Sequence, residues 1–199
     1  MKNRLILASG SEIRAQLLRN AGVEFDIVAA KIDESSLKLS LLEQAAKPHD
    51  IADALAEYKA RKVSQKHPKA FVIGADQILA CGDLIYDKPD SQQTVIRHLH
   101  ELRGRAHRLH SAAVIYQGGQ PQWRFVKQVK LTMRDFSDRY LAQYVDRNWP
   151  EISHSVGGYQ LENEGARLFH RVEGDYFTVL GLPLIEVLGY LTERGILEQ

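Results

Sequence analysis

The sequence predicts an α/β fold with a mixed sheet flanked by helices. β-like apolar runs alternate with amphipathic helical segments in the first half of the chain. Two long β-rich segments then flank a Gly-Gly turn, which is typical of an antiparallel hairpin. Strands joined through helices pair in parallel, so the two patterns together favour a mixed sheet. The 199 residues fit one compact domain spanning 1–199, for which we expect two lobes around a central cleft.

The first strand and helix form the most informative segment. An apolar strand, Leu5–Leu7, ends in a small-residue turn that opens into an amphipathic helix with Ser11 as N-cap and Gly22 as stop. The apolar face of this helix consists of Ile13, Leu17, Leu18 and Ala21. Free N–H groups at a helix start attract anions, so the turn is a candidate phosphate site, with Ser9, Ser11 and Arg14 as its side chains. The alternative is an ordinary βα unit whose serines only cap the helix.

The next segments continue the alternation of strand and helix. A strand is expected at 24–29, then a loop at Asp33–Ser36 and a segment with helical patterning. A further helix starts near Asp50, and Ile51, Leu55, Tyr58 and Lys62 share one stripe with Lys59 beside it. The remaining expected elements are strands at 70–80 and 84–86, a turn at 81–83, a helix at 91–102, a hairpin turn at 117–120, and helices at 137–148 and 184–194.

Composition narrows the class of protein. The net charge of +1 offers no global attraction to nucleic acid or membranes. The single cysteine, Cys81, excludes an internal disulfide, suits a reducing cytosol, and has a structural role. Only four apolar residues follow Met1–Arg4, too few for a signal-peptide core, and no apolar run reaches the length of a membrane span. We expect a cytoplasmic protein.

Several charged residues have both a structural and a chemical explanation. Asp76 and Gln77 interrupt an apolar strand, where a carboxylate is costly unless it is paired, binds a metal or faces a cleft. Asp33–Glu34 is by default a solvated turn or a helix cap, and Lys59 and Lys88 are by default solvated lysines. His107 is expected to lie partly exposed where a loop enters a strand.

Together these residues suit phosphoanhydride hydrolysis. The serine turn with Arg14, Lys59 and Lys88 suits a polyphosphate, while Glu34 and Asp76 suit a divalent metal or a general base. Mg²⁺ and Mn²⁺ prefer such oxygen ligands. The sequence lacks a P-loop, a nucleophile elbow and a His-Glu-x-x-His pair.

The chain resembles the Maf family of nucleoside triphosphate pyrophosphatases over nearly its whole length. The matching pieces, in family order, are Leu7–Ser11 with Arg14, Asp33–Glu34, the helix with Lys59, Gly74–Gln77, Lys88–Pro89, Gly104–His107, Gly157–Tyr159, Val172–Asp175 and Gly181–Leu184. The resemblance implies a two-lobed α/β fold, commonly dimeric. It also implies metal-dependent hydrolysis of a nucleotide between its α and β phosphates, with Mg²⁺, Mn²⁺ or Co²⁺.

Roles follow from the same resemblance. Asp76 takes the place of the catalytic proton acceptor, and Glu34 lies with Asp76 near the metal. The phosphate-binding positions are Ser9, Ser11, Arg14, Lys59 and Lys88. The family usually has Pro-Arg where this chain has Glu12–Ile13, and an inward Glu12 would repel phosphate. The specificity positions, Ile13, Gln77 and Glu162, resemble the group that acts on 7-methyl-GTP, although Glu164 is a rival for the role of Glu162.

The sequence therefore predicts a cytoplasmic hydrolase of nucleotide metabolism with a house-cleaning role. We expect it to release pyrophosphate from a nucleoside triphosphate, with 7-methyl-GTP or another modified nucleotide as substrate. A carboxylate at Glu162 suits the N1–H and N2–H₂ donors of guanine. The alternatives are a dTTP/UTP pyrophosphatase of the same family and a non-catalytic nucleotide-binding regulator linked to cell division.

Overall fold

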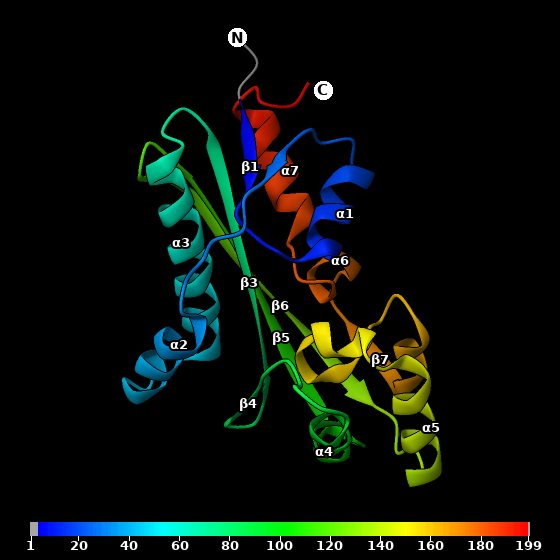
Figure 1. Cartoon of the computed structure of the whole chain (residues 1–199). Coiled ribbons are helices and arrows are strands. Elements are labelled where there is room, and N and C mark those ends of the chain that lie inside the picture. The colour runs from blue at the N-terminus through cyan, green and yellow to red at the C-terminus, as the bar shows by residue number, and fades with distance from the viewer. Residues whose placement is uncertain (1–3, 199) are drawn as a thin grey trace. The chain divides into compact units, whose positions relative to one another are not determined.

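The computed structural model describes residues 4–198 and contains a mixed sheet with helices packed against it (Figure 1). The strand order is β2-β1-β3-β5-β6-β7, and β4 pairs with β3. The predicted mixed α/β fold is confirmed. The strands are β1 (Leu5–Leu7), β2 (Asp26–Ile27), β3 (Phe71–Cys81), β4 (Leu84–Tyr86), β5 (Ala106–Gln117), β6 (Gln120–Met133) and β7 (Phe169–Glu173). The α-helices are α1 (Glu12–Asn20), α2 (Glu34–Glu43), α3 (Pro48–Lys66), α4 (Gln92–Leu102), α5 (Asp138–Asn148), α6 (Tyr176–Val179) and α7 (Leu184–Glu193).

The chain divides into two compact units, which are described separately. Unit 1 takes Met1–Gln77, Ser111–Lys127 and Gly181–Gln199, and unit 2 takes Ile78–His110 and Gln128–Leu180. The single domain and the central cleft expected from the sequence stay predictions. The segment Met1–Asn3, which bears on the signal-peptide argument, lies outside the described residues. Within residues 4–198, no helix combines the length and apolarity that crossing a membrane requires.

Unit 1 is built on parallel pairing around β1. Strand β1 pairs in parallel with β2 and with β3, as strands joined by helices do. Neighbouring side chains of β6 point to opposite faces, because Arg124 binds Asp53 and Glu57 of α3 while Trp123 stacks on Tyr190 of α7. Helices α3 and α7 therefore cover opposite faces of the sheet in this unit (Figure 1).

The first strand and helix follow the prediction closely. Helix α1 begins after Ser11 and ends before Gly22, which has a φ of +72°. Gly22 N–H donates to Arg19 and Val23 N–H donates to Leu18, the pair of bonds of a Schellman cap. Ala21, expected on the apolar face, lies exposed at the C-cap, and the buried face is Arg14, Ala15, Leu17 and Leu18. The predicted strand at 24–29 is reduced to the two residues of β2.

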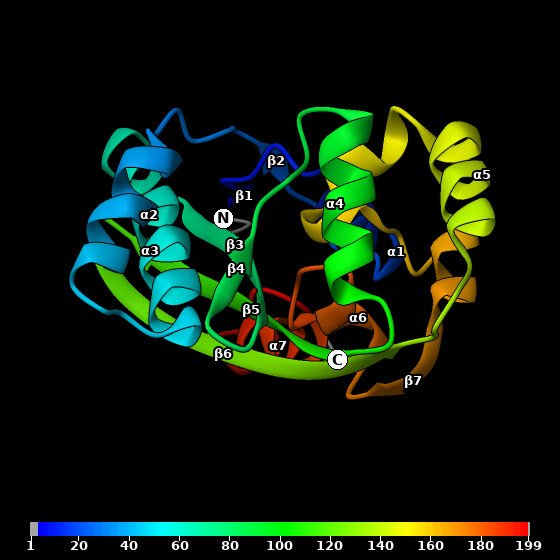
Figure 2. The same ribbon diagram turned by 90° about the horizontal axis from the view of Figure 1, so that it is seen from below.

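The orientation of α3 differs from the prediction. Ile51 and Leu55 are buried as expected, but Tyr58 is 47% exposed, Lys62 is exposed, and Lys59 is buried. The reason is that α3 turns its small residues, Ala56 and Ala60, toward Gly74 of β3. Helix α2 lies beside the same helix (Figures 1 and 2). Close contact with the strand leaves no room for a tyrosine on that face and brings the neighbouring Lys59 inward.

We expect Gly74→Ala to destabilise the protein by about 1–3 kcal/mol, because a Cβ at this position would lie 2.1 Å from the Ala56 carbonyl oxygen. The free energy of unfolding in urea measures the effect. Gly189→Ala in α7 is the matched control, since nothing lies within 4 Å of its added Cβ and alanine favours a helix. Equal stability of Gly74→Ala and the wild type would contradict the close packing of α3 on β3.

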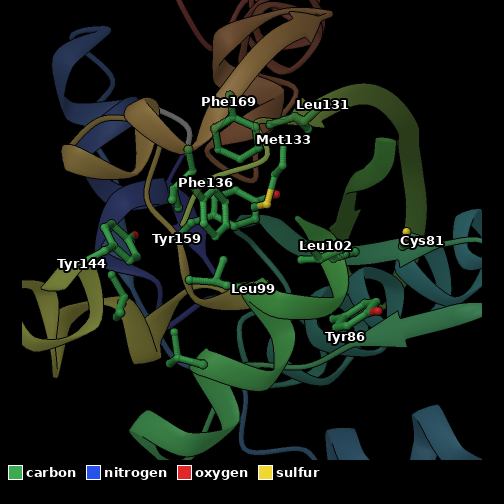
Figure 3. Packing of buried hydrophobic residues seen from close by; sticks show 14 of the residues in the cluster. Cys81, Tyr86, Leu99, Leu102, Leu131, Met133, Phe136, Tyr144, Tyr159 and Phe169 are labelled. Atoms are coloured by element: carbon green, nitrogen blue, oxygen red, sulfur yellow. The ribbon is translucent and has the colours of Figure 1, made fainter. Parts of the chain in front are cut away.

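Unit 2 has its own hydrophobic core, in which aromatic side chains pack among leucines and valines (Figure 3). Tyr144, Tyr159, Phe136 and Phe169 pack with Leu99 and Leu102 of α4. Helices α4 and α5 begin as predicted, since Ser91 and Ser137 accept hydrogen bonds from Thr94 N–H and Tyr140 N–H. Cys81 is buried, in keeping with its expected structural role. The short elements β7, α6 and three 3-10 helices have no counterpart in the sequence analysis, because they are too short to show a period.

His107 is buried in this core, so its expected partial exposure is wrong. Its Nε2 lies 2.8 Å from the Tyr159 hydroxyl, and its ring packs against Phe169. Burial lowers the pKa of His107 to about 4.

As a result, stability should depend on His107 between pH 6.5 and about 4. In this window the unfolded chain binds a proton on His107 that the folded chain does not, so the free energy of unfolding falls as pH falls, by about 3 kcal/mol over the whole window. His107→Gln should flatten this part of the pH profile of urea unfolding. His49→Gln, at an exposed site, is the control that should keep it. Identical profiles for wild type and His107→Gln would contradict the assignment.

Candidate functional site

Three charged residues of unit 1 meet where α2, α3 and β3 come together. Lys59 Nζ donates to Asp76 Oδ1 at 2.6 Å and lies 3.0 Å from Glu34 Oε2. Lys59 is 6% exposed and Asp76 is 7% exposed, whereas the Glu34 side chain is 52% exposed. The lysine thus joins one buried and one accessible carboxylate. We call Glu34, Lys59 and Asp76 the charged triad.

The sequence positions the triad through close packing of α3 on β3 and through a helix cap. Gly74 lets α3 approach β3, which places Lys59 against Asp76 two residues further along the strand. Asp33 accepts a hydrogen bond from Ser36 N–H and so fixes the start of α2, the helix that begins with Glu34. Asp33 is therefore a cap, as its default explanation held, while Lys59 is not a solvated lysine. The sequence analysis did not identify the role of Gly74 in this site. A glycine within a buried strand indicates a close approach of another backbone, and could have predicted it.

Two of the predicted anion-binding side chains, Ser9 and Ser11, lie in the turn between β1 and α1, and the third, Arg14, lies in the first turn of α1. Ser9 Oγ accepts hydrogen bonds from Ser11 N–H and from Arg14 Nη1, each at 3.2 Å. Ser11 occupies the predicted N-cap position, but its side chain makes no capping bond, so the explanation that the serines only cap the helix is wrong for Ser11. The first N–H groups of α1 therefore have no side-chain cap, which is the condition for anion binding at a helix start.

Arg14 is buried beneath this turn, at 9% exposure. Its Nε donates to the Gly181 carbonyl at 2.7 Å, and its Nη1 donates to the Ala75 carbonyl at 3.0 Å. Burial lowers the pKa of Arg14, and the nearby charges of Asp76 and Glu34 oppose that shift. Arg14 and Lys59 together balance the two carboxylates.

The two unusual residues at the start of α1 do not block the turn. Glu12 pairs with Arg19 at 2.5 Å, and its side chain is 76% exposed, so its carboxylate is held away from the buried Arg14. Ile13 is half-buried. Gln77, which follows Asp76, donates from Nε2 to Ser111 Oγ at 2.9 Å, which orients its amide.

Lys88 and Glu162 belong to unit 2, so their place in one site with the unit 1 residues stays a prediction. Lys88 is exposed between β4 and α4, and Glu162 is half-buried in a turn before the 3-10 helix at Glu164–Leu168. Burial raises the pKa of Glu162.

Glu164, the rival for the role of Glu162, is held by its neighbours. It binds Arg147 at 2.5 Å and Asn148 at 2.9 Å, and these bonds lower its pKa to about 2. Glu164 thus forms an ion pair with Arg147 that links two parts of unit 2. Glu162 also lies near enough to Tyr176 for its charge to raise the pKa of that tyrosine, after the larger effect of burial. Tyr176 is 47% exposed, and the sequence analysis did not single it out.

The two carboxylates of the charged triad suit a hard cation that is also bound by phosphate oxygens. Among residues 4–198, no group of three or more His, Cys, Asp and Glu side chains is placed to hold a metal. Mg²⁺ needs only one or two protein carboxylates when substrate phosphates and waters complete its shell. Glu34 and Asp76 supply that number.

These features define a class: an α/β protein that has, in one unit, a serine turn at an uncapped helix start and a buried carboxylate–lysine pair. A family model described as a Maf-like protein matches residues 4–194, and the chain belongs to the Maf family. It is 56% identical to a nucleoside triphosphate pyrophosphatase of Ruegeria pomeroyi over 194 residues, 98% of each chain. It is 51% identical to one from a Ruegeria species over the whole of both chains, and 44% identical to a 7-methyl-GTP pyrophosphatase of Brucella abortus, also over the whole of both.

Proposed function

We propose that this protein is a nucleoside triphosphate pyrophosphatase that hydrolyses the bond between the α and β phosphates. The observation that carries the proposal is the buried Lys59–Asp76 pair, 2.6 Å apart, in the same unit as the turn of Ser9 and Ser11. A binding protein has no need of a desolvated carboxylate held by a lysine, because burying that charge is costly. The names of relatives that match the chain along its whole length support the same activity.

The reaction uses Asp76 as general base. Lys59 holds Oδ1, so Oδ2 accepts a proton from the attacking water as its oxygen bonds to the α-phosphorus. The bond from the α-phosphorus to the bridging oxygen breaks, and that oxygen leaves with pyrophosphate. Ser9, Ser11, Lys59 and Lys88 bind phosphate oxygens in this proposal. Glu34 and Asp76 would hold a divalent cation, Mg²⁺, Mn²⁺ or Co²⁺, which neutralises charge on the phosphates.

We further propose a preference for 7-methyl-GTP. Glu162 accepts hydrogen bonds from the N1–H and N2–H₂ groups of guanine, and its charge complements the methylated, cationic ring. The exposed ring of Tyr176, in the same unit as Glu162, offers a surface on which that cation stacks. The homodimer and the cytoplasmic location expected from the sequence stay predictions.

A panel of nucleotides tests the substrate. With Mg²⁺, Mn²⁺ or Co²⁺ present, we expect pyrophosphate release from 7-methyl-GTP with a kcat/KM at least about 10-fold above that for dTTP or UTP. Glu162→Gln should reduce this preference, because the amide loses the charge and one acceptor. Glu151→Gln, an exposed acid elsewhere in unit 2, is the control.

Two outcomes would contradict the proposal at different levels. A strong preference for dTTP and UTP would exclude the 7-methyl-GTP assignment and favour the other group of the family. Tight nucleotide binding with no cleavage at any metal would favour the non-catalytic regulator.

A further inference from the structure

Arg14 contacts three segments of unit 1 that are far apart in the sequence. Its guanidinium donates to Ser9 in the turn, to Ala75 in β3 and to Gly181 in the segment before α7. The family resemblance predicts that Arg14 binds the substrate phosphates. In the structure, however, all three of these hydrogen-bond acceptors belong to the protein itself.

The guanidinium of Arg14 has too few unused hydrogens on adjacent nitrogens to bind a phosphate in a bidentate manner. The group has five N–H donors, one on Nε and two on each Nη. The single hydrogen of Nε goes to Gly181, and the two hydrogens of Nη1 go to Ser9 and Ala75. The remaining two are both on Nη2, whereas a bidentate contact needs hydrogens on two adjacent nitrogens. We propose that Arg14 is a positioning residue that aligns Ser9 and Asp76, and that it does not bind phosphate as a bidentate ligand.

The contact with Ser9 decides what the serine can offer to a ligand. Ser9 Oγ accepts from Ser11 N–H and from Arg14 Nη1, which occupies both acceptor sites of the hydroxyl. Among residues 4–198, no hydrogen bond uses the Ser9 hydroxyl hydrogen, so Ser9 is left as a donor. A donor is what a phosphate oxygen requires.

The contact with Ala75 fixes the general base from its backbone side. Ala75 directly precedes Asp76, and its carbonyl is held by Arg14 while Lys59 holds the Asp76 carboxylate. The position of Asp76 is therefore set at both ends. A Cβ on Gly181, whose φ is +98°, would lie 3.2 Å from Arg14 Nε, so that segment closes the third side of the guanidinium.

The inference rests on the proposed function, and steady-state kinetics with 7-methyl-GTP tests it. Lysine has a single nitrogen, which cannot reach the three acceptors that two nitrogens of Arg14 contact. Arg14→Lys should therefore let Asp76 shift. We expect kcat to fall at least about 10-fold, while KM changes less than about 3-fold. Ser9→Ala, which removes a direct phosphate donor, should instead raise KM. Arg19→Lys is the control on the same helix, because its partner Glu12 is exposed; it should match the wild type.

A binding measurement that does not depend on turnover separates the effect of Arg14 on substrate affinity from its effect on catalysis. Calorimetry with a 7-methyl-GTP analogue carrying a methylene bridge between the α and β phosphorus should give Arg14→Lys a Kd within about 3-fold of the wild type. Gly181→Ala, which presses on Arg14 from the far side, should reproduce the fall in kcat. A rise in KM and Kd for Arg14→Lys at unchanged kcat would make Arg14 a phosphate ligand and overturn the inference. A wild type that binds the analogue but cleaves no nucleotide contradicts the proposed function alone, and the Kd comparison then decides the role of Arg14.

Discussion

Asp76→Asn is expected to remain folded and to lose pyrophosphate release by about 10²–10⁴-fold, the usual contribution of a general base. Asparagine has nearly the shape of aspartate, and its amide oxygen still accepts the hydrogen bond that Lys59 now donates to Oδ1. What it lacks is a group that takes a proton from water. Pyrophosphate release measures the loss, and the urea midpoint measures folding.

Asp26→Asn is the matched control, because Asp26 is an exposed acid of unit 1 that pairs with Arg4 at 2.7 Å. It should keep the wild-type rate. An Asp76→Asn variant that retains most of the wild-type activity would show that Asp76 is not the base. A variant that no longer folds would assign Asp76 a mainly structural role in the pair with Lys59.

Lys59→Met is expected to lower both stability and activity. The side chains of Lys59 and Asp76 are only 8% and 11% exposed, so removing the ammonium leaves a buried carboxylate without its partner. Breaking such a pair costs about 3–5 kcal/mol. Urea unfolding measures this loss, and the same variant should release almost no pyrophosphate.

A double variant separates the structural from the chemical role of the lysine. Lys59→Met/Asp76→Asn removes the charge that is left unpaired, so much of the lost stability should return while activity stays absent. Lys62→Met on the exposed face of α3 is the control and should be close to wild type in stability. Equal stability of the single and double variants would mean that the pair is not buried as described.

The comparison of Lys59 with Tyr58 shows where prediction from the sequence fails. Periodicity correctly identified a helix, because a stripe of apolar residues recurs along α3. It could not determine which neighbouring face is buried, since Lys59 and Tyr58 lie one residue apart and an apolar stripe favours the tyrosine. Gly74 determines which face is buried, because Ala56 and Ala60 of α3 pack closely against it.

The burial of Arg14 and of His107 could not be predicted, for a related reason. Both are polar residues whose partners come from distant segments: Arg14 binds Ala75 and Gly181, and His107 binds Tyr159. Local sequence carries no record of such partners, so a solvated or ligand-binding role was the natural expectation. The expected exposure of His107 is therefore wrong, while the phosphate-binding role of Arg14 stays a prediction.

The sequence by itself determined the α/β alternation, the hairpin at Gly118–Gly119, the bounds of α1 between Ser11 and Gly22, and the ordered set of family motifs. These are local signals, set by side-chain period, by turn residues and by cap residues close in the chain. The tertiary structure alone decided that Lys59 joins Glu34 to Asp76 and that Arg14 donates hydrogen bonds to Ala75 and Gly181. The physical reason is that burial of charge depends on partners brought together by packing, and packing joins residues that the sequence keeps far apart.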